Sequence, residues 1–240
     1  MKQKAYFTVE DLVVDYGGVR AIDGIRLALD KGEIRGLIGP NGAGKSTFID
    51  AVTGRRLPTA GRVTLGGEDI TRLSIIARRD RGLSRSFQRT SIFADMPVLE
   101  QVFLASHQAR AEHPEEDALA ILKELDLEAY ADWRAGDLGY GQQRRLDLAL
   151  ALVGSPSVLL LDEPMAGLTV TESRDLAEHL KRLARERRVT VLLVEHDMEI
   201  VFGISDRVTV IELGKPLAEG TPDEVRANPK VREAYLGSAA

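Results

Sequence analysis

The sequence predicts an α/β fold in which a mostly parallel sheet is covered by helices on both faces. Two observations predict it. A glycine-rich loop at residues 39–46 lies between an apolar stretch at 34–38 and a helical stretch at 46–53, which Gly54 ends. Beyond residue 154, apolar runs alternate with amphipathic stretches. Strands and helices that alternate around such a loop are typical of a doubly wound parallel sheet.

The loop matches the phosphate-binding pattern G-x-x-x-x-G-K-[ST] at every constrained position. Glycines let the backbone turn its N–H groups toward phosphate oxygens, and the helix N-terminus adds a favourable dipole. Lys45 is placed to reach the β- and γ-phosphates, and the Ser46 hydroxyl to ligate Mg²⁺. We therefore expect a P-loop NTPase (RecA-like) core. The residues that bind the nucleotide are Gly39, Pro40, Asn41, Gly42, Ala43, Gly44, Lys45, Ser46 and Thr47.

The segment around the loop has the pattern of antiparallel strands. Ile25, Leu27 and Leu29 alternate with Arg26, Ala28 and Asp30, which is the period-two pattern of a half-buried strand. Val63 and Leu65 repeat the pattern before a Gly-Gly turn. An antiparallel β piece is therefore predicted at the N-terminal end.

Helical periodicity takes over between residues 96 and 153. A stripe of Ala118, Ile121, Leu122 and Leu125 has the i, i+3, i+4, i+7 spacing of an amphipathic helix. We expect residues 91–153 to form a helical subdomain inserted into the nucleotide-binding core, which comprises 1–90 and 154–220. The polar tail at 221–240 is expected to be a small helical appendage, and the whole chain 1–240 a single domain.

The second half of the core shows three more strands. Continuous apolar runs at 158–161 and 189–194 are typical of strands covered on both faces, and 208–213 follows them. Between the first two runs, a helix is indicated by the stripe Leu176, Leu180, Leu183 and Ala184.

Composition excludes several kinds of chemistry. The net charge of −5 gives no general attraction to nucleic acid. Without cysteine there are no disulfides, thiolate nucleophiles or cysteine-ligated zinc, which fits a reducing compartment. No secretory pattern and no apolar run of about 20 residues is visible, so we expect a cytoplasmic protein that meets a membrane only through a partner. A solvated or phosphate-facing edge is expected for the arginines Arg78, Arg79, Arg81, Arg85 and Arg89.

Two carboxylates follow the apolar run at 158–161. A buried strand delivers Asp162 and Glu163 to its carboxyl end, where α/β sheets bind ligands. Asp162 is suited to hold Mg²⁺, and Glu163 to orient and deprotonate the water that attacks the γ-phosphate. An acidic pair in a solvated turn is the alternative, which the upstream phosphate loop disfavours.

A second glycine-rich helix start reads Leu138-Gly139-Tyr140-Gly141-Gln142. Such a start is a second anion site. With it the chain resembles the ATP-binding cassette family over nearly its whole length, since that family's signature reads L-S-G-G-Q. The order also resembles the family's: Tyr16, the phosphate loop, Gln88, the signature, Asp162-Glu163 and His196.

The resemblance implies a role for each of these residues. Tyr16 would stack on adenine, and His196 would contact the γ-phosphate and hold Glu163. Gln88 would touch Mg²⁺ and the attacking water and report to a membrane partner. Gly139, Tyr140, Gly141 and Gln142 would close over ATP bound to another subunit. Hydrolysis of ATP would then require a head-to-tail dimer with two ATP molecules between its subunits.

Two positions depart from the family pattern. Gly139 replaces the signature serine, so a hydroxyl contact to the γ-phosphate is missing and a working but modest ATPase is expected. Thr169 stands where many cassettes have aspartate, and with Glu172 it matches the T-x-x-E capping box of a helix start.

Four segments, 140–145, 195–198, 203–207 and 232–237, resemble the ATPase subunits of branched-chain amino acid importers. Such subunits work as a pair of cassettes at the cytoplasmic face of the inner membrane, beneath two membrane permease subunits fed by a periplasmic binding protein. The segment between 88 and 138 is shorter than expected for them, so urea or amide uptake and lipopolysaccharide export stay open, as does a soluble cassette. Phe93, Met96 and Leu99 are candidates for docking a membrane-subunit helix or for packing the helical lobe.

Overall fold

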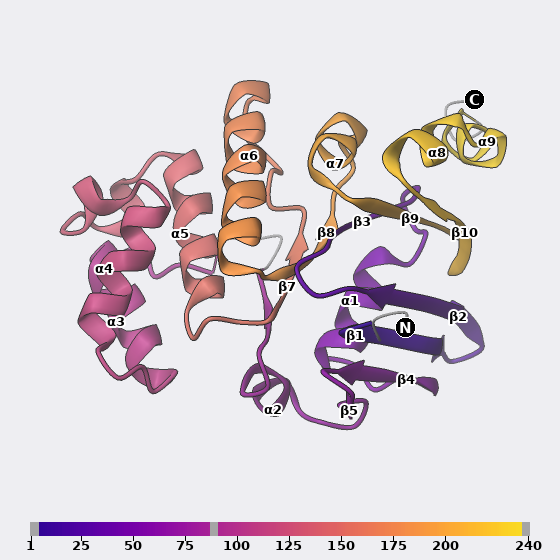
Figure 1. Cartoon of the computed structure of the whole chain (residues 1–240), viewed down its shortest axis with the longest axis horizontal. Coiled ribbons are helices and arrows are strands. Elements are labelled where there is room, and N and C mark those ends of the chain that lie inside the picture. Colours follow the sequence, from indigo (N-terminus) through magenta and orange to yellow (C-terminus); the bar gives the residue numbers. More distant parts are fainter. Residues whose placement is uncertain (1–4, 87–90, 237–240) are drawn as a thin grey trace.

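The computed structural model describes residues 5–86 and 91–236, which form two sheets with helices around them (Figure 1). The smaller sheet is antiparallel, in the order β2-β1-β4-β5. Its strands are β1 (Phe7–Tyr16), β2 (Val19–Leu29), β4 (Ala60–Leu65) and β5 (Glu68–Asp69). The antiparallel piece predicted from the alternating residues is confirmed, with β1 as a strand that the pattern did not indicate.

The larger sheet has the order β10-β9-β3-β8-β7-β6 and is parallel except for its edge strand β10. Its strands are β3 (Ile34–Ile38), β6 (Leu83–Arg85), β7 (Val158–Asp162), β8 (Thr190–Val194), β9 (Arg207–Glu212) and β10 (Lys215–Gly220). Every residue of β3, β7 and β8 is buried, as expected for central strands covered on both faces. The α/β class and the mostly parallel sheet are confirmed.

Helix α1 (Lys45–Thr53) joins the two sheets, because Phe48 and Ile49 pack in one apolar cluster with Phe7 of β1 and Leu37 of β3. Gly54 ends the helix in the left-handed conformation, with φ 84°, and donates its N–H to the Ala51 carbonyl. The predicted helix end is therefore confirmed, and the helix begins one residue earlier than expected.

A helical lobe lies on the opposite side of the molecule from the antiparallel sheet (Figure 1). It contains α3 (Val98–Gln108), α4 (Pro114–Glu124), two short turns at Glu128–Tyr130 and Ala135–Asp137, and α5 (Tyr140–Leu152). The stripe Ala118, Ile121, Leu122 and Leu125 is fully buried and packs in the same cluster as residues of α6 (Val170–Arg187). Helices in the middle segment are thus confirmed, while its bounds as a subdomain stay a prediction.

The chain ends in helices beside β9 and β10. These are α7 (Met198–Ile204), α8 (Pro222–Ala227) and α9 (Pro229–Leu236). Val225 of α8 and Val231 of α9 pack with Ile38 and Val208 on one face of the larger sheet. The helical tail is confirmed, and α7 and the short α2 (Ile75–Arg79) are helices that the sequence pattern did not indicate.

The arginine cluster is not a solvated edge throughout. Arg78 is only 1% exposed. Its guanidinium donates to the carbonyl oxygens of Ala51 and Val52 at the end of α1 and to those of Thr71 and Leu73. Arg78 therefore provides a donor to the Val52 carbonyl at the helix end and a second donor, beside the Gly54 N–H, to the Ala51 carbonyl. Arg79 and Arg81 are exposed as expected, and Arg89 lies outside the described residues.

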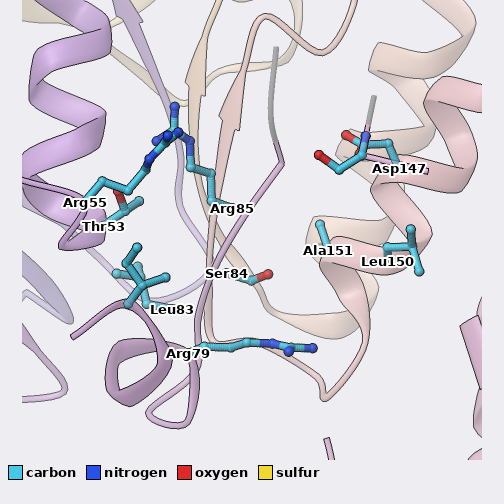
Figure 2. A pocket seen from close by; sticks show the side chains of 11 residues that line it. Thr53, Arg55, Arg79, Leu83, Ser84, Arg85, Asp147, Leu150 and Ala151 are labelled. Atoms are coloured by element: carbon cyan, nitrogen blue, oxygen red, sulfur yellow. The ribbon is translucent and has the colours of Figure 1, made fainter. Parts of the chain in front are cut away.

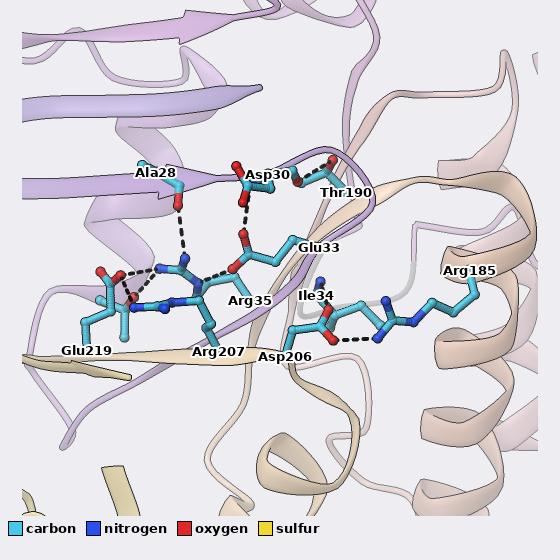
Figure 3. A network of polar contacts seen from close by, with 11 residues as sticks. Ala28, Asp30, Glu33, Ile34, Arg35, Arg185, Thr190, Asp206, Arg207 and Glu219 are labelled. Atoms are coloured by element: carbon cyan, nitrogen blue, oxygen red, sulfur yellow. Dashed lines mark hydrogen bonds and ion pairs between the residues drawn. The ribbon is translucent and has the colours of Figure 1, made fainter. Parts of the chain in front are cut away.

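A buried arginine also ties the two sheets together (Figure 3). Arg35 of β3 donates to Glu33 Oε1 at 2.7 Å, to Thr209 Oγ1 of β9 at 3.0 Å and to the Ala28 carbonyl of β2 at 3.0 Å. Glu219 of β10 lies 3.3 Å from the same guanidinium. Since β3 leads directly into the phosphate loop, this network fixes the base of the loop relative to both sheets.

Candidate functional site

The candidate site lies at the carboxyl ends of three neighbouring strands, β3, β8 and β7. The phosphate loop follows β3, Asp162 ends β7, and His196 comes shortly after β8. Parallel strands present their carboxyl ends at the same edge, which is where such sheets bind ligands. Residues far apart in the sequence are thereby brought to one edge.

The phosphate loop requires its glycines. Gly42 and Gly44 have φ values of 78° and 102°, which side chains rarely adopt. A Cβ on Gly44 would lie 2.7 Å from the Ala21 carbonyl oxygen of β2, and one on Gly39 would lie 2.2 Å from that of Ile211. The loop therefore has the bare backbone that a phosphate chain needs for close approach.

Lys45 is buried at the centre of this loop. Its Nζ donates to the carbonyl oxygens of Gly39 at 2.6 Å and Pro40 at 3.1 Å. Burial lowers the pKa of Lys45, and the carboxylates of Glu163 and Asp162 partly oppose that shift. The lysine and the two carboxylates predicted from separate motifs thus share one electrostatic environment.

Asp162 is buried and paired with an arginine that sequence reasoning did not connect to it. Arg85 of β6 lies 2.8 Å from Asp162 Oδ2 and 2.6 Å from Asp50 Oδ1. Burial raises the pKa of Asp162, while Arg85 lowers it. The solvated alternative is therefore wrong for Arg85 as well, whereas the phosphate-facing one stays a prediction. Its place in the arginine cluster, three residues before Gln88, was the only sequence signal.

Glu163 marks the turn out of β7. Its φ is 51°, in the left-handed region that a glutamate rarely occupies, and its N–H donates to the Val194 carbonyl of β8 at 2.8 Å. Backbone strain of this kind is concentrated at functional sites. The backbone of this half-buried glutamate is therefore held in place at the sheet edge.

His196 projects beside this turn, with a side chain 67% exposed. Its Nδ1 lies 3.6 Å from the buried carboxylate of Glu195, which also accepts the Met165 N–H. The role of Glu195 was missed by sequence reasoning, because the resemblance of the segment 195–198 does not tell which residues Glu195 contacts. Gln88, expected beside Mg²⁺, lies outside the described residues.

Tyr16 lies where the β1–β2 hairpin turns, and it is 42% exposed. The Arg56 guanidinium stacks on its ring, 3.6 Å from the ring centroid. Farther along β2, the Asp23 N–H donates to Gly214, whose own N–H donates to the Ala43 carbonyl in the phosphate loop. The hairpin is therefore tied to the loop, and the role of Tyr16 in binding adenine stays a prediction.

The signature segment opens α5, with Gly139 as its N-terminal cap in an extended conformation. Tyr140 stands at a glycine position of the L-S-G-G-Q pattern. Its hydroxyl donates to the Ala166 carbonyl at 3.1 Å and accepts from Arg144 Nη2 at 2.8 Å. The Tyr140 side chain thus binds the loop after Glu163 in its own chain, a contact that the family pattern did not indicate. Gly141 and Gln142 continue the first turn of α5.

The residues at this edge fit a triphosphate with Mg²⁺. An exposed Ser46 hydroxyl and the Asp162 carboxylate are oxygen ligands of the kind Mg²⁺ prefers. Within 5–86 and 91–236, no group of three or more His, Cys, Asp or Glu side chains is placed to hold a metal ion. A magnesium ion here would therefore share its coordination with phosphate oxygens and water, as in nucleotide sites.

A family model described as "ABC transporter" matches residues 22–166, which include the phosphate loop, Asp162 and Glu163. The chain belongs to the ABC transporter family. A second model, described as "Branched-chain amino acid ATP-binding cassette transporter", matches residues 215–240, from β10 to the end of the tail. Two independent stretches of this cassette thus match.

Relatives match over almost the whole length of the cassette. It is 40% identical to the high-affinity branched-chain amino acid transport ATP-binding protein BraF of Pseudomonas aeruginosa, covering 96% of this chain and 97% of the relative. Identity to the protein LivG of Escherichia coli, which has the same description, is 39%, with 97% and 98% covered.

A solved structure shows the same fold. The ADP conformation of MJ1267, an ATP-binding cassette of an ABC transporter, superposes with a TM-score of 0.90 and 31% identity, covering 98% of this chain and all of that one. The cassette is therefore a P-loop ATPase by fold and family. In the part of the chain that the structure describes, no helix is long and apolar enough to span a membrane.

A groove of about 500 Å³ lies between the core and the helical lobe (Figure 2). Arg79 and Arg85 line it from the core, and Asp147 and Leu150 line it from α5. None of the three docking candidates lines it: Phe93 is exposed, whereas Leu99 packs against the lobe's own cluster. Met96 is half-buried, and its carbonyl accepts from Gln101.

Proposed function

We propose that this cassette hydrolyses ATP to energise import of branched-chain amino acids across the cytoplasmic membrane. The observation that carries the proposal is the match of residues 215–240 to the branched-chain cassette model, because this tail lies outside the part matched by the general family model. The names of the full-length relatives agree with it.

In the proposed reaction, water attacks the γ-phosphate, the bond to the leaving oxygen of ADP breaks, and inorganic phosphate departs. The N–H groups of the phosphate loop and Lys45 hold the phosphate chain, and Tyr16 holds the adenine. Ser46, Gln88 and Asp162 would hold Mg²⁺, which would supply positive charge to stabilise the phosphate oxygens. Glu163 takes the proton from the attacking water, and His196 contacts the γ-phosphate. The shared edge of β3, β7 and β8 supports this assignment.

We infer that the site is completed by a second cassette. Helix α5, which Gly139 caps at its N-terminus, lies in the helical lobe, away from α1 and the antiparallel sheet (Figure 1). A signature at that position serves the phosphate loop of another subunit in a head-to-tail dimer. The second cassette is either a copy of this chain or a related one.

The groove between core and lobe is the proposed contact with two membrane permease subunits, which would hold the cassette on the cytoplasmic face of the inner membrane. Arg85 supports this, because its side chain both lines the groove and pairs with Asp162. A helix that enters the groove would thereby act on a residue beside the nucleotide. A periplasmic binding protein would take part only through the permease.

The test is transport in liposomes that contain this cassette with the membrane subunits that co-purify with it and the matching binding protein. We expect ATP-dependent uptake of leucine, isoleucine and valine, and none with Lys45→Ala cassette. Uptake of urea or amides instead, or export of lipopolysaccharide, would replace the amino-acid assignment and leave the ATPase assignment intact.

A further inference from the structure

Glu195 is a buried carboxylate between the two loops that carry the proposed catalytic residues. It follows β8 directly, precedes His196, and is 1% exposed. A carboxylate removed from water in this way is unfavourable unless donors are provided for it. Burial indeed raises the pKa of Glu195. The hydrogen bonds that Glu195 accepts therefore show which parts of the chain this buried carboxylate connects.

Two backbone groups donate to it, one from each loop. The Met165 N–H donates to Oε1 at 2.8 Å, and the His196 N–H donates to Oε2 at 3.2 Å. The His196 ring nitrogen Nδ1 is 3.6 Å from the same Oε2. One side chain thus spans the gap between the histidine and the loop that begins after Glu163.

That loop is also held from its other side. The carbonyl of Ala166, next to Met165, accepts from the Tyr140 hydroxyl and from Arg144 Nη2, both at 3.1 Å. Adjacent residues of the loop are therefore bound to the end of β8 and to the signature helix α5. The two hydrogen bonds that Glu195 accepts therefore set the position of this loop relative to His196.

We propose that Glu195 is a positioning residue that holds His196 and the loop after Glu163 at a fixed spacing for hydrolysis. This proposal rests on the roles proposed above for His196 and Glu163. A leucine would fill the same space but leave the two N–H groups without acceptors. A glutamine keeps one acceptor oxygen and turns an NH₂ group toward the other donor.

The test compares Glu195→Leu and Glu195→Gln with the unaltered chain in steady-state ATP hydrolysis. We expect kcat to fall about tenfold in the leucine variant and less in the glutamine variant, since hydrogen bonds to charged groups are among the stronger ones. KM for ATP should stay within about twofold, because the phosphate loop and Tyr16 are untouched. Unchanged kcat in the leucine variant overturns the proposal.

Glu199→Gln is the matched control. Glu199 lies in the first turn of α7, its side chain is exposed, and its ion pair with Arg174 is at the surface. The same chemical change there should leave kcat and KM unaltered. If Glu195→Leu unfolds, the glutamine variant carries the test, and a wild-type kcat in that folded variant contradicts the proposal.

A double-mutant cycle with His196→Ala separates two claims: that Glu195 acts by positioning His196, and that His196 takes part in hydrolysis. If Glu195 acts through His196, adding Glu195→Leu to His196→Ala lowers kcat little further, whereas independent, additive losses overturn the inference. An inactive His196→Ala beside a fully active Glu195→Leu defeats the inference and leaves the proposed function standing. A fully active His196→Ala defeats the role of His196 in the proposed function itself.

Discussion

Glu163 shows how a single residue depends on both its type and its backbone. Its left-handed φ and its N–H bond to Val194 fix its backbone at the exit of β7. Glutamine has the same shape and can hold the same backbone, but it cannot accept a proton. The substitution therefore separates base chemistry from folding.

Glu163→Gln is expected to lower ATP turnover by about a hundredfold or more, because general-base catalysis contributes on that order. ATP binding should persist, since Lys45 and the loop glycines are unaltered. Phosphate release and nucleotide affinity measure the two effects. Unchanged turnover would rule out Glu163 as the base.

Gly139 is a residue whose backbone does not require glycine. Its φ of −62° and ψ of 157° suit a serine at a helix N-terminus, and a Cβ there would lie 2.5 Å from only the mobile end of the Gln142 side chain. Gly139→Ser should therefore retain or raise ATP turnover and stabilise the protein by a few tenths of a kcal/mol. Phosphate release and urea unfolding check this; outright loss of turnover contradicts it.

His179 of α6 should make stability depend on pH. Its Nε2 is hydrogen-bonded to the Glu124 carbonyl, so it carries the proton, and Nδ1 accepts from Arg145 at 3.2 Å and Arg182 at 3.3 Å. Asp126, the one facing anion among the described neighbours, is 3.4 Å from Nδ1. Burial, the largest cause, lowers the pKa of His179, and the two arginines add to it.

The lowered pKa means that the unfolded chain takes up a proton near pH 6.5 while the folded protein does not. The free energy of unfolding should therefore fall as the pH drops below that value, and no His179 contribution should appear above it. Urea unfolding at pH 7.5 and 5.5 should show a smaller fall in His179→Gln than in the unaltered protein. If the free energy of unfolding falls equally in the variant and in the unaltered protein, other groups cause the pH dependence.

At the scale of elements, helix ends decide where the chain turns. Thr169 and Glu172 form the predicted capping box at the start of α6, with the Thr169 N–H donating to Glu172 at 2.9 Å. The sequence could predict this capping box because its two partners lie only three residues apart. The end of α1, in contrast, depends on Arg78, which comes from a separate helix and whose burial no local pattern indicates.

Arg78→Ala should lower the free energy of unfolding by about 3 kcal/mol, because it removes the bonds of a buried guanidinium to four carbonyls, of which only that of Ala51 has a further donor described here, the Gly54 N–H. Urea unfolding measures the loss. Arg79→Ala, at the exposed neighbour, is the control and should change stability by less than about 0.5 kcal/mol. Equal effects of the two substitutions would show that the bonds of Arg78 contribute nothing specific.

At the scale of the whole molecule, the phosphate loop and the signature helix are presented by different parts of one chain (Figure 1). A second cassette in head-to-tail orientation would bring a loop and a signature together twice. Assembly should therefore respond to ATP.

Glu163→Gln cassette is expected to shift from monomer to dimer in ATP with Mg²⁺ and to stay monomeric in ADP, because the bound γ-phosphate then joins the two copies. Light scattering after gel filtration measures the mass. A monomer at saturating ATP, with binding confirmed, would contradict the dimer, or show that a different cassette is the natural partner.

The sequence by itself determined the phosphate loop, the buried strands, the helix periods and the capping box, because each of these is a local pattern of a few residues. Only the tertiary structure decided which polar residues are buried and with which partners they pair. Arg78, Arg85 and Glu195 have partners up to 77 residues away, and Tyr140 reaches 26 residues along the chain to Ala166. A charge is buried or solvated according to what packs against it, and that is settled when distant strands meet at one edge.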